Sequence, residues 1–273
     1  MTLNPTTSVH NTEAYGLKAL AGLIDHIHSA SFPKMLEEFI GRICQFDSFL
    51  MLTYKTHFKP LVLHPKSPAE HSPTLRFYID QAYIFDPIYH LVKESPAADV
   101  HRICDIAPDS FHSTEYYEKC YKYFDLVDEI NLIIPLDNEV TCAIALGRKS
   151  QLGSINRQEH NALKQWLPVL ASLVQQFWLT QQSLYIDNAK PEGAIQQALT
   201  SFGSGVLTRR EQQITALILQ GHSSKAISAL LDISPGTVKV HRKNIHTRLN
   251  TSTQSEIFQQ FLTHLKSLDD SIE

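Results

Sequence analysis

The chain has 273 residues, 43% of them hydrophobic and 19% charged, a composition typical of a globular protein long enough for two domains. No segment approaches the about 20 uninterrupted apolar residues of a membrane span, and the polar N-terminus lacks an apolar signal core, so we expect a cytoplasmic protein. The net charge of -4 conceals an asymmetry, because residues 206–266 hold eight Lys or Arg against three Asp or Glu, whereas residues 1–205 are acidic overall.

A polar lead of residues 1–13, expected to be disordered, precedes segments whose apolar residues follow helical or strand periods. In chain order the pattern predicts helices over 14–29 and 32–45, strands over 48–54 and 60–64, a helix over 72–92 interrupted at Pro87, a strand over 99–106, an aromatic-rich helix over 111–123, a hairpin of 129–136 and 140–147, and a long helix over 155–184. Hairpins among mixed elements predict the α+β fold class, a sandwich built on an antiparallel sheet.

Residues 185–205 contain few large apolar side chains and are punctuated by proline and glycine, which is typical of a linker. This linker would separate a ligand-sensing or dimerisation domain of residues 14–184 from a wholly helical domain of residues 206–267. A basic domain attached to an acidic body favours nucleic acid as the partner of the helical part.

The helical domain carries regular helix start and stop signals. They are a capping-box spacing from Thr208 to Glu211, a possible left-handed stop at Gly221, a cap at Ser223 or Ser224, a cap and first-turn proline at Ser234 and Pro235, and a second box from Thr253 to Glu256. These signals predict four helices, and the short helix, tight turn and longer helix among them make a helix-turn-helix.

The third of these helices has one apolar side. At about 100° per residue, Val238, Ile245 and Leu249 form a stripe that we expect to be buried against Ile227 and Leu230. The stripe would anchor the helix to the rest of the domain and leave its other sides to solvent.

A second, cationic face of this helix carries Lys239, Lys243 and His246. Such a face suits the DNA major groove, where Lys can donate to guanine while Arg, Ser and Thr donate to phosphates. A solvated basic helix on an ordinary bundle is the alternative explanation of the charges alone. The caps, the turn and the helix length together favour DNA binding.

Several stretches carry a family resemblance, namely LTRRE at 207–211, Gly221, the S-x-x-x-I spacing of 223–227, and SPGTVKVHRKNI at 234–245. They resemble the LuxR-type helix-turn-helix, which response regulators of the NarL kind share. The resemblance implies that Lys225 and Arg242 hold phosphates and that Thr237, Lys239 and Lys243 lie in or beside the groove. Ser234 joins this predicted DNA-binding set as a hydroxyl donor at the helix start.

The same resemblance implies double-stranded DNA as the partner and a homodimer on a dyad-symmetric site. Residues 252–265 and the N-terminal domain are the candidate dimer interfaces. The N-terminal part lacks the strand–helix alternation and the acidic residues of a phosphorylatable receiver domain, so a response regulator is not expected.

Residues 14–184 are similar to the N-terminal domains of unpaired, or solo, LuxR-type regulators, in the tyrosines and Asp-Pro of 78–89, in 105–111 and in the Tyr pair at 116–117. This resemblance implies an α-β-α sandwich that binds a small-molecule effector. Acyl-homoserine-lactone receptors carry a Trp and a Tyr at positions that here give Pro73 and Phe77, which argues against such a lactone as the effector.

Four residues are candidate ligand contacts: Tyr83, Asp86, Tyr89 and Tyr117. The Asp86 carboxylate would accept a hydrogen bond from an amide, amine or hydroxyl, or it would simply cap the helix that begins at Pro87. The tyrosines, together with Cys120, could line a pocket or belong to the core.

Other chemistry finds no support in the motifs. The four cysteines are widely spaced, the 14 histidines are scattered, and common hydrolase, P-loop and metalloprotease motifs are absent, so we expect no metal, no cofactor and no enzyme. The sequence therefore predicts a DNA-binding transcriptional regulator controlled by a small molecule. A ligand-independent regulator, controlled by its abundance or by a protein partner, and more remotely an enzyme with an attached DNA module, are the alternatives.

Overall fold

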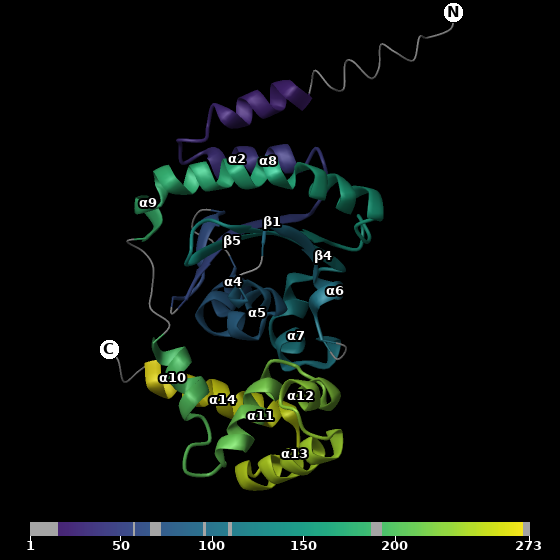
Figure 1. Ribbon diagram of the computed structural model, residues 1–273, viewed down its shortest axis with the longest axis vertical. Helices are drawn as coiled ribbons and strands as arrows, with labels where there is room; N and C mark the ends of the chain where they lie inside the picture. Colours follow the sequence, from purple (N-terminus) through teal and green to yellow (C-terminus); the bar gives the residue numbers. More distant parts are fainter. Residues whose placement is uncertain are drawn as a thin grey trace, which may run out of the picture.

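The computed structural model describes residues 16–56, 58–65, 72–94, 97–108, 111–186 and 193–269, and the lead of residues 1–13 lies outside them. Within these ranges the chain forms a layered α+β part, followed by a helical part at the opposite end of the molecule (Figure 1). The predicted fold class is confirmed.

One antiparallel sheet of five strands lies at the centre of the α+β part, in the order β2-β1-β5-β4-β3. The strands are β1 (Ser48–Lys55), β2 (Leu61–His64), β3 (Asp99–Arg102), β4 (Asp128–Pro135) and β5 (Val140–Arg148). Successive side chains alternate between the two faces, so that Met51 belongs to one hydrophobic core and Leu52 to another. Both faces are therefore covered, and the predicted hairpin is confirmed as β4 and β5.

The predicted strand over 99–106 is too long. Only four residues pair with β4, and the chain then turns into the short helix α6 (Ile103–Ile106), because Ile103 is drawn into the core beside the sheet. The strand ends where its pairing with the neighbouring strand ends.

Helices α2 (Phe32–Ile40) and α8 (Arg157–Gln181) cover one face of the sheet (Figure 1). Helix α8 begins at a complete capping box between Asn156 and Glu159, and Pro168 lies within it. Its buried side, which packs on the sheet, consists of Leu163, Leu167, Leu170, Ala171, Val174, Phe177 and Trp178. Helical residues 16–24 lie beyond this layer, and α9 (Ser183–Ile186) follows α8.

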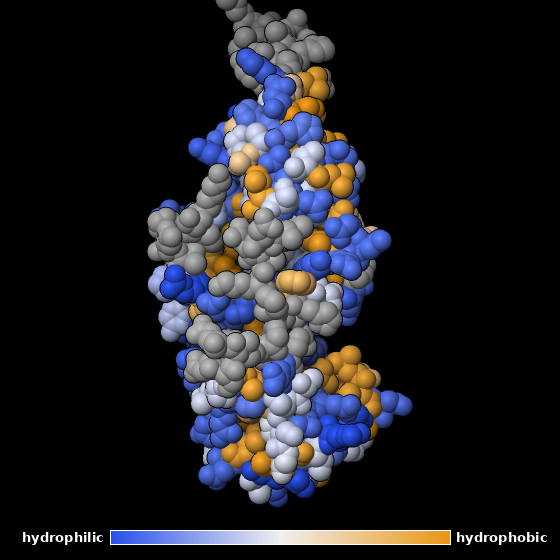
Figure 2. Space-filling model, turned by 90° about the vertical axis from the view of Figure 1, so that its left-hand side faces the viewer, coloured by the Kyte–Doolittle hydropathy of each residue, from blue (hydrophilic) through white to orange (hydrophobic). Residues whose placement is uncertain are grey.

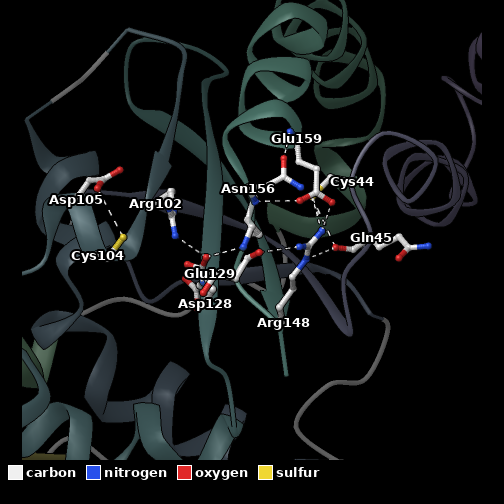
Figure 3. Close-up of polar contacts among 12 residues, drawn as sticks. Cys44, Gln45, Arg102, Cys104, Asp105, Asp128, Glu129, Arg148, Asn156 and Glu159 are labelled. Atoms are coloured by element: carbon white, nitrogen blue, oxygen red, sulfur yellow. Dashed lines mark hydrogen bonds and ion pairs between the residues drawn. The ribbon is translucent and has the colours of Figure 1, made fainter. Parts of the chain in front are cut away.

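A polar network joins the start of α8 to the ends of the strands (Figure 3). The guanidinium of Arg148, which is 3% exposed, pairs with the Glu159 carboxylate and donates to the carbonyl oxygen of Gln45 at 2.7 Å. On the neighbouring strand, Asp128 accepts from Arg102 at 2.7 Å and from the backbone N–H of Ile155 at 2.8 Å. The buried charges of this network are thus paired, as burial demands.

Short helices cover the other face of the sheet. They are α4 (Pro73–Phe77), the π-turn η1 (Tyr78–Ala82), the 3-10 turn η2 (Tyr83–Phe85), α5 (Pro87–Lys93), α6, η3 (Phe111–Ser113), α7 (Glu115–Lys119) and η4 (Tyr121–Phe124). The predicted interruption of the helix over 72–92 at Pro87 is confirmed, whereas the further breaks in it and those in the helix over 111–123 were not predicted. The breaks have local causes, because Asp86 and Thr114 each accept a backbone hydrogen bond and start a new helix.

The helical part contains α10 (Gly193–Ser201), α11 (Arg209–Leu219), α12 (Ser224–Leu230), α13 (Pro235–Leu249) and α14 (Gln254–Asp269). Helix α10 falls within the predicted linker of residues 185–205, which is a correction. One narrow side of this helix is apolar. It carries Ile195 and Ala198, which are both fully buried where α10 packs against α14. The low count of large apolar residues concealed this packing.

The two parts share one continuous hydrophobic core. The Phe85 ring packs 4.9 Å from that of Phe258 and 5.6 Å from that of Phe261, both on α14. The Ser255 hydroxyl donates to Glu115 of α7 at 3.1 Å. The short helices between α4 and η4 therefore form a middle layer between the sheet and the helical part, as Figure 1 shows.

Hydrophilic residues cover much of the side seen in Figure 2, and apolar residues appear there as small patches among them. Within the described residues, none of the helices combines the length and the apolar character that crossing a bilayer requires.

Candidate functional site

The helix-turn-helix starts are built by side-chain caps. Glu211 and Thr208 form a reciprocal box, in which the backbone N–H of Thr208 donates to Glu211 Oε2 at 2.9 Å. Ser223, and not Ser224, caps α12 by accepting from the N–H of Ala226 at 3.2 Å. Gly221 has a φ of 85°, which confirms its predicted role as a left-handed helix stop.

The caps of the last two helices follow the same principle with one difference. Ser234 accepts from the N–H of Thr237 at 3.0 Å at the start of α13. At the start of α14, Thr253 accepts from the N–H of Glu256 at 3.2 Å, but the Glu256 carboxylate receives its bond from Ser252 rather than from Thr253. Only half of the second predicted box is formed.

The apolar stripe of α13 anchors this helix as predicted. Val238 and Ile245 are fully buried, and Leu249 is partly buried against the same core as Ile227. Leu230 does not face this stripe, since 58% of its surface is exposed. It is the last residue of α12, and the end of this helix is exposed to solvent.

A set of polar and cationic side chains is open to solvent on α12 and α13, at the end of the molecule remote from the sheet (Figure 1). Its exposed members are Lys225, Ser234, Thr237, Lys239 and Lys243. No ion pair neutralises these lysines within the described ranges. An unpaired cationic surface of this kind attracts phosphate.

Two side chains predicted for this surface, Arg242 and His246, are less exposed and form hydrogen bonds within the chain. Arg242 is half-buried and donates to Gln254 of α14 at 3.2 Å, and burial lowers the pKa of its guanidinium. His246, placed on the cationic face by helical geometry, bonds Thr251 at 2.9 Å. Val240, which follows Lys239 in the chain, is an apolar residue of which 59% is exposed, and helical geometry did not predict this exposure.

A cavity of about 220 Å³ lies between the sheet and the short helices of the middle layer. Its polar side chains come from both layers and include Asp86, Glu129 and Asn131. Tyrosines, leucines and small residues make up most of the remaining wall, including Tyr54, Tyr78, Tyr116, Tyr121, Leu50, Leu52, Leu75, Ile88, Phe124, Leu126, Ala143 and Ala145. An apolar cavity with a few convergent polar groups is the usual form of a small-molecule site.

A chain of hydrogen bonds holds Asp86 at this cavity. The Tyr54 hydroxyl lies 2.6 Å from that of Tyr78, and the Tyr78 hydroxyl donates to Asp86 Oδ2 at 2.7 Å. The other carboxylate oxygen accepts from the N–H of Ile88 at 2.8 Å and so caps α5. Asp86 thus fulfils both roles considered for it, since it is a helix cap and a cavity-lining residue.

The second acid is Glu129 of β4, whose Oε1 accepts from Asn131 at 2.7 Å. Burial, together with the negative charge of Asp86, raises the pKa of Glu129 to about 7. Burial also raises the pKa of Asp86 to about 6, against the bonds from Tyr78 and Ile88 that favour its ionised form. Two carboxyls that line one cavity between packed layers are costly to ionise without a cation.

The predicted tyrosines do not line this cavity. Tyr83 is fully buried, and its ring meets the Tyr89 ring edge-on at 5.0 Å, while Tyr117 stacks on Tyr121 at 5.8 Å. Cys120 is also buried in the core. Of the four predicted ligand contacts, only Asp86 reaches the cavity, because the break at η1 and η2 turns Tyr83 away from it.

Glu129 and Asn131 were missed, although the sequence contained a signal. They alternate with Ile130 and Leu132 along β4, a strand that has a neighbour on each side and helices over both faces. Their alternation places both polar side chains on one face of the strand, and the helices over that face keep them inside the molecule, beside the cavity. Among the described residues no group of three or more His, Cys, Asp or Glu side chains could hold a metal ion.

Comparison with known proteins agrees with this architecture. The family model of bacterial regulatory proteins, luxR family, matches residues 205–260. An HTH-type transcriptional regulator in the exeN 3' region of Aeromonas salmonicida is 32% identical over 186 residues, covering 66% of this chain and 94% of that protein. A monoamine regulon transcriptional regulator of Klebsiella aerogenes is 22% identical over 80% of this chain and 85% of its own length.

Among solved structures, the VqsR LBD domain from Pseudomonas aeruginosa is similar, with a TM-score of 0.54 and 23% identity over 60% of this chain and 95% of that one. The fold and the exposed helix-turn-helix define a bacterial DNA-binding transcriptional regulator. More specifically, the chain belongs to the LuxR family of regulators.

Proposed function

We propose that a small molecule bound in the cavity beside Asp86 controls how this regulator occupies its DNA site. The observation that carries this proposal is that the cavity and the contact with α14 share one middle layer of short helices. The same short helices line the cavity on one side and contact α14 of the DNA-binding module on the other. A ligand that favours one packing of these helices would change the module's freedom to bind.

The DNA contacts that we propose are those of the exposed face on α12 and α13. Lys239 and Lys243 would read base edges in the major groove, with Thr237 and Val240 beside them. Val240 would contact a thymine methyl group. Lys225, Ser234 and, after release from Gln254, Arg242 would hold phosphates.

Selection of bound duplexes from a random pool, followed by fluorescence anisotropy with the full chain, tests this proposal. We expect a specific duplex to bind about 10³-fold or more tightly than random DNA at physiological salt. Equal affinity for all duplexes would contradict sequence-specific recognition.

Control by a small molecule is tested by heating the full chain with fractionated metabolite pools. A ligand in excess over its dissociation constant stabilises the protein, by about 2.7 kcal/mol at a hundredfold excess. The stabilising fraction should also change the affinity for the selected duplex. A ligand-independent regulator would show neither effect, and the cavity favours the ligand-responsive form.

We also propose a homodimer on a dyad-symmetric site in the bacterial cytoplasm, from the family membership. The apolar side of α14, within the predicted interface 252–265, is occupied inside this chain, since Ile257, Phe258, Phe261 and Leu265 are fully buried. Dimerisation through that side would require the module to leave the middle layer. Light scattering with and without the selected duplex measures the assembly, and one chain per duplex would contradict a dimer.

A further inference from the structure

The cavity holds negative groups without a matching positive one. Of the described side chains that line it, Asp86 and Glu129 are acids, and none is Lys, Arg or His. Neither acid belongs to an ion pair within the part of the chain that the structure describes. Buried charges in proteins are normally paired, so this cavity lacks a partner that a ligand can supply.

Nearby cations are already engaged elsewhere. Figure 3 shows Glu129 directly after Asp128 on β4, and it is the Asp128 carboxylate that accepts the hydrogen bond from the Arg102 guanidinium. The other guanidinium of this region, that of Arg148, pairs with Glu159 at the start of α8. These pairs leave Glu129 with the amide of Asn131 and the hydroxyl of Tyr121 as its hydrogen-bond donors.

The remaining lining of the cavity is aromatic and apolar, which matches the apolar part of a small organic cation. The rings of Tyr78, Tyr116 and Tyr121 line the same cavity as the two acids, and aromatic rings attract cations that approach their faces. The volume of about 220 Å³ is below the about 300–1,000 Å³ of pockets for drug-sized ligands. The ligand is therefore compact, with a short apolar part against the leucines and alanines of the wall.

We infer that the cavity binds a small organic ammonium ion, whose positive nitrogen lies between the carboxylates of Asp86 and Glu129. An ammonium group offers up to three N–H donors and the charge that both acids lack. This inference rests on the proposed function, because it assigns the ligand chemistry of the same effector cavity.

Other ligand charges fit less well. An anion would meet two acids and no base among the described lining residues, and it would lose its hydration on entry. A neutral alcohol or amide would donate one or two hydrogen bonds but leave the two carboxylates repelling each other. Only a cation lowers the free energy of both ionised acids at once.

Calorimetric titration of the full chain with three matched probes tests the assignment: 2-phenylethylamine, 2-phenylethanol and 3-phenylpropanoate. At about pH 8 both acids are ionised and the amine is protonated. We expect the amine to bind at least about tenfold more tightly than the alcohol, and the carboxylate not to bind. Butylamine and 1-butanol repeat the comparison with a smaller apolar part.

Variants separate charge from shape. Glu129→Gln keeps the size of the side chain and should weaken amine binding by about tenfold or more, while alcohol binding stays nearly unchanged. Glu118→Gln, at an exposed ion pair with Lys122, is the matched control and should bind the amine as the parent does. Melting curves of each variant establish that it is folded.

The inference is overturned if the alcohols bind as tightly as the amines, if neither amine binds, or if Glu129→Gln leaves amine affinity intact. Alcohol binding that shifts DNA affinity would refute the ammonium class while leaving small-molecule control standing. Amine binding without any effect on DNA affinity would leave the ammonium class in place and refute control through this cavity.

Discussion

The Phe85 ring packs 4.9 Å from the Phe258 ring, whereas Asp86, the next residue, turns its carboxylate into the cavity on the opposite side. Two consecutive residues thus connect the cavity with the last helix of the DNA-binding module. The contact is apolar and buried, so its removal should be measurable both as stability and as local protection.

Phe85→Ala should lower the free energy of unfolding by about 3–5 kcal/mol, because it removes a fully buried aromatic ring. It should also speed hydrogen exchange at the backbone amides of α14, which loses its packing partner. Phe32→Ala, in the core on the other face of the sheet, is the control. Comparable deprotection of α14 in both variants would show that Phe85 has no special part in the domain contact.

Gly221→Ala should destabilise the chain by at least about 1 kcal/mol, because its φ of 85° disfavours a side chain. An added Cβ would also lie 2.6 Å from Cγ2 of Thr114, on the neighbouring domain. Thr114→Ser removes that methyl group and keeps the hydroxyl that caps α7. In the Thr114→Ser background the cost of Gly221→Ala should fall. An unchanged cost in urea unfolding would mean that the turn conformation alone accounts for it.

Lys239→Ala should cost about 1–3 kcal/mol of binding to the selected duplex and relax the sequence preference, because a base contact is lost. Lys225→Ala should weaken binding to all duplexes alike and reduce the salt slope by about one, because a phosphate contact is lost. Lys34→Ala, on the distant helix α2, is the control for charge alone. If all three variants bind like the parent in anisotropy titrations, the proposed face does not meet DNA.

Glu129→Gln should stabilise the chain above about pH 7, by up to about 3 kcal/mol. The native pKa of about 7 lies above the ordinary 4.5, so the native state holds the proton more tightly than the unfolded state. Stability from this residue is therefore full below pH 4.5 and is lost as the pH rises through 7. Melting temperatures at several pH values measure the difference, and a difference that does not vary with pH would contradict the argument.

His90 should have the opposite pH dependence. Burial lowers its pKa to about 4, with help from the neighbouring His222 and Lys93. The native state then binds fewer protons than the unfolded state between about 4 and 6.5, so stability falls as the pH drops below 6.5. His90→Gln should recover about 2 kcal/mol at pH 5 relative to pH 8. Urea unfolding of this variant and of His28→Gln, an exposed control, decides whether the dependence belongs to His90.

The sequence predicted the elements whose local signals agree with their surroundings. The caps at Thr208 and Ser234, the stop at Gly221 and the β4–β5 hairpin all follow from short-range chemistry. The long helix α8 followed from its apolar period, and most of the cationic face followed from helical geometry. These features need no knowledge of what packs against them.

The features that escaped prediction depend on contacts distant in sequence. Helix α10 is stabilised by α14, more than fifty residues later, and its own sequence resembles a linker. Arg242 and His246 form hydrogen bonds with Gln254 and Thr251, and helical geometry alone does not predict these partners. The tyrosines that these helices turn to the cavity could be told apart from those of the core only after the breaks in the helices over 72–92 and 111–123 were known.

The continuous core that runs from the sheet through Phe85 to α14 has a thermodynamic consequence. We expect the two parts to melt together, so that calorimetry of the full chain gives one cooperative peak rather than two. A substitution that destabilises the α+β part would then also reduce the folded fraction of the DNA-binding module. Each part therefore constrains which substitutions the other part tolerates. Replacing one part by that of a relative would require the buried contacts between the two parts to be redesigned.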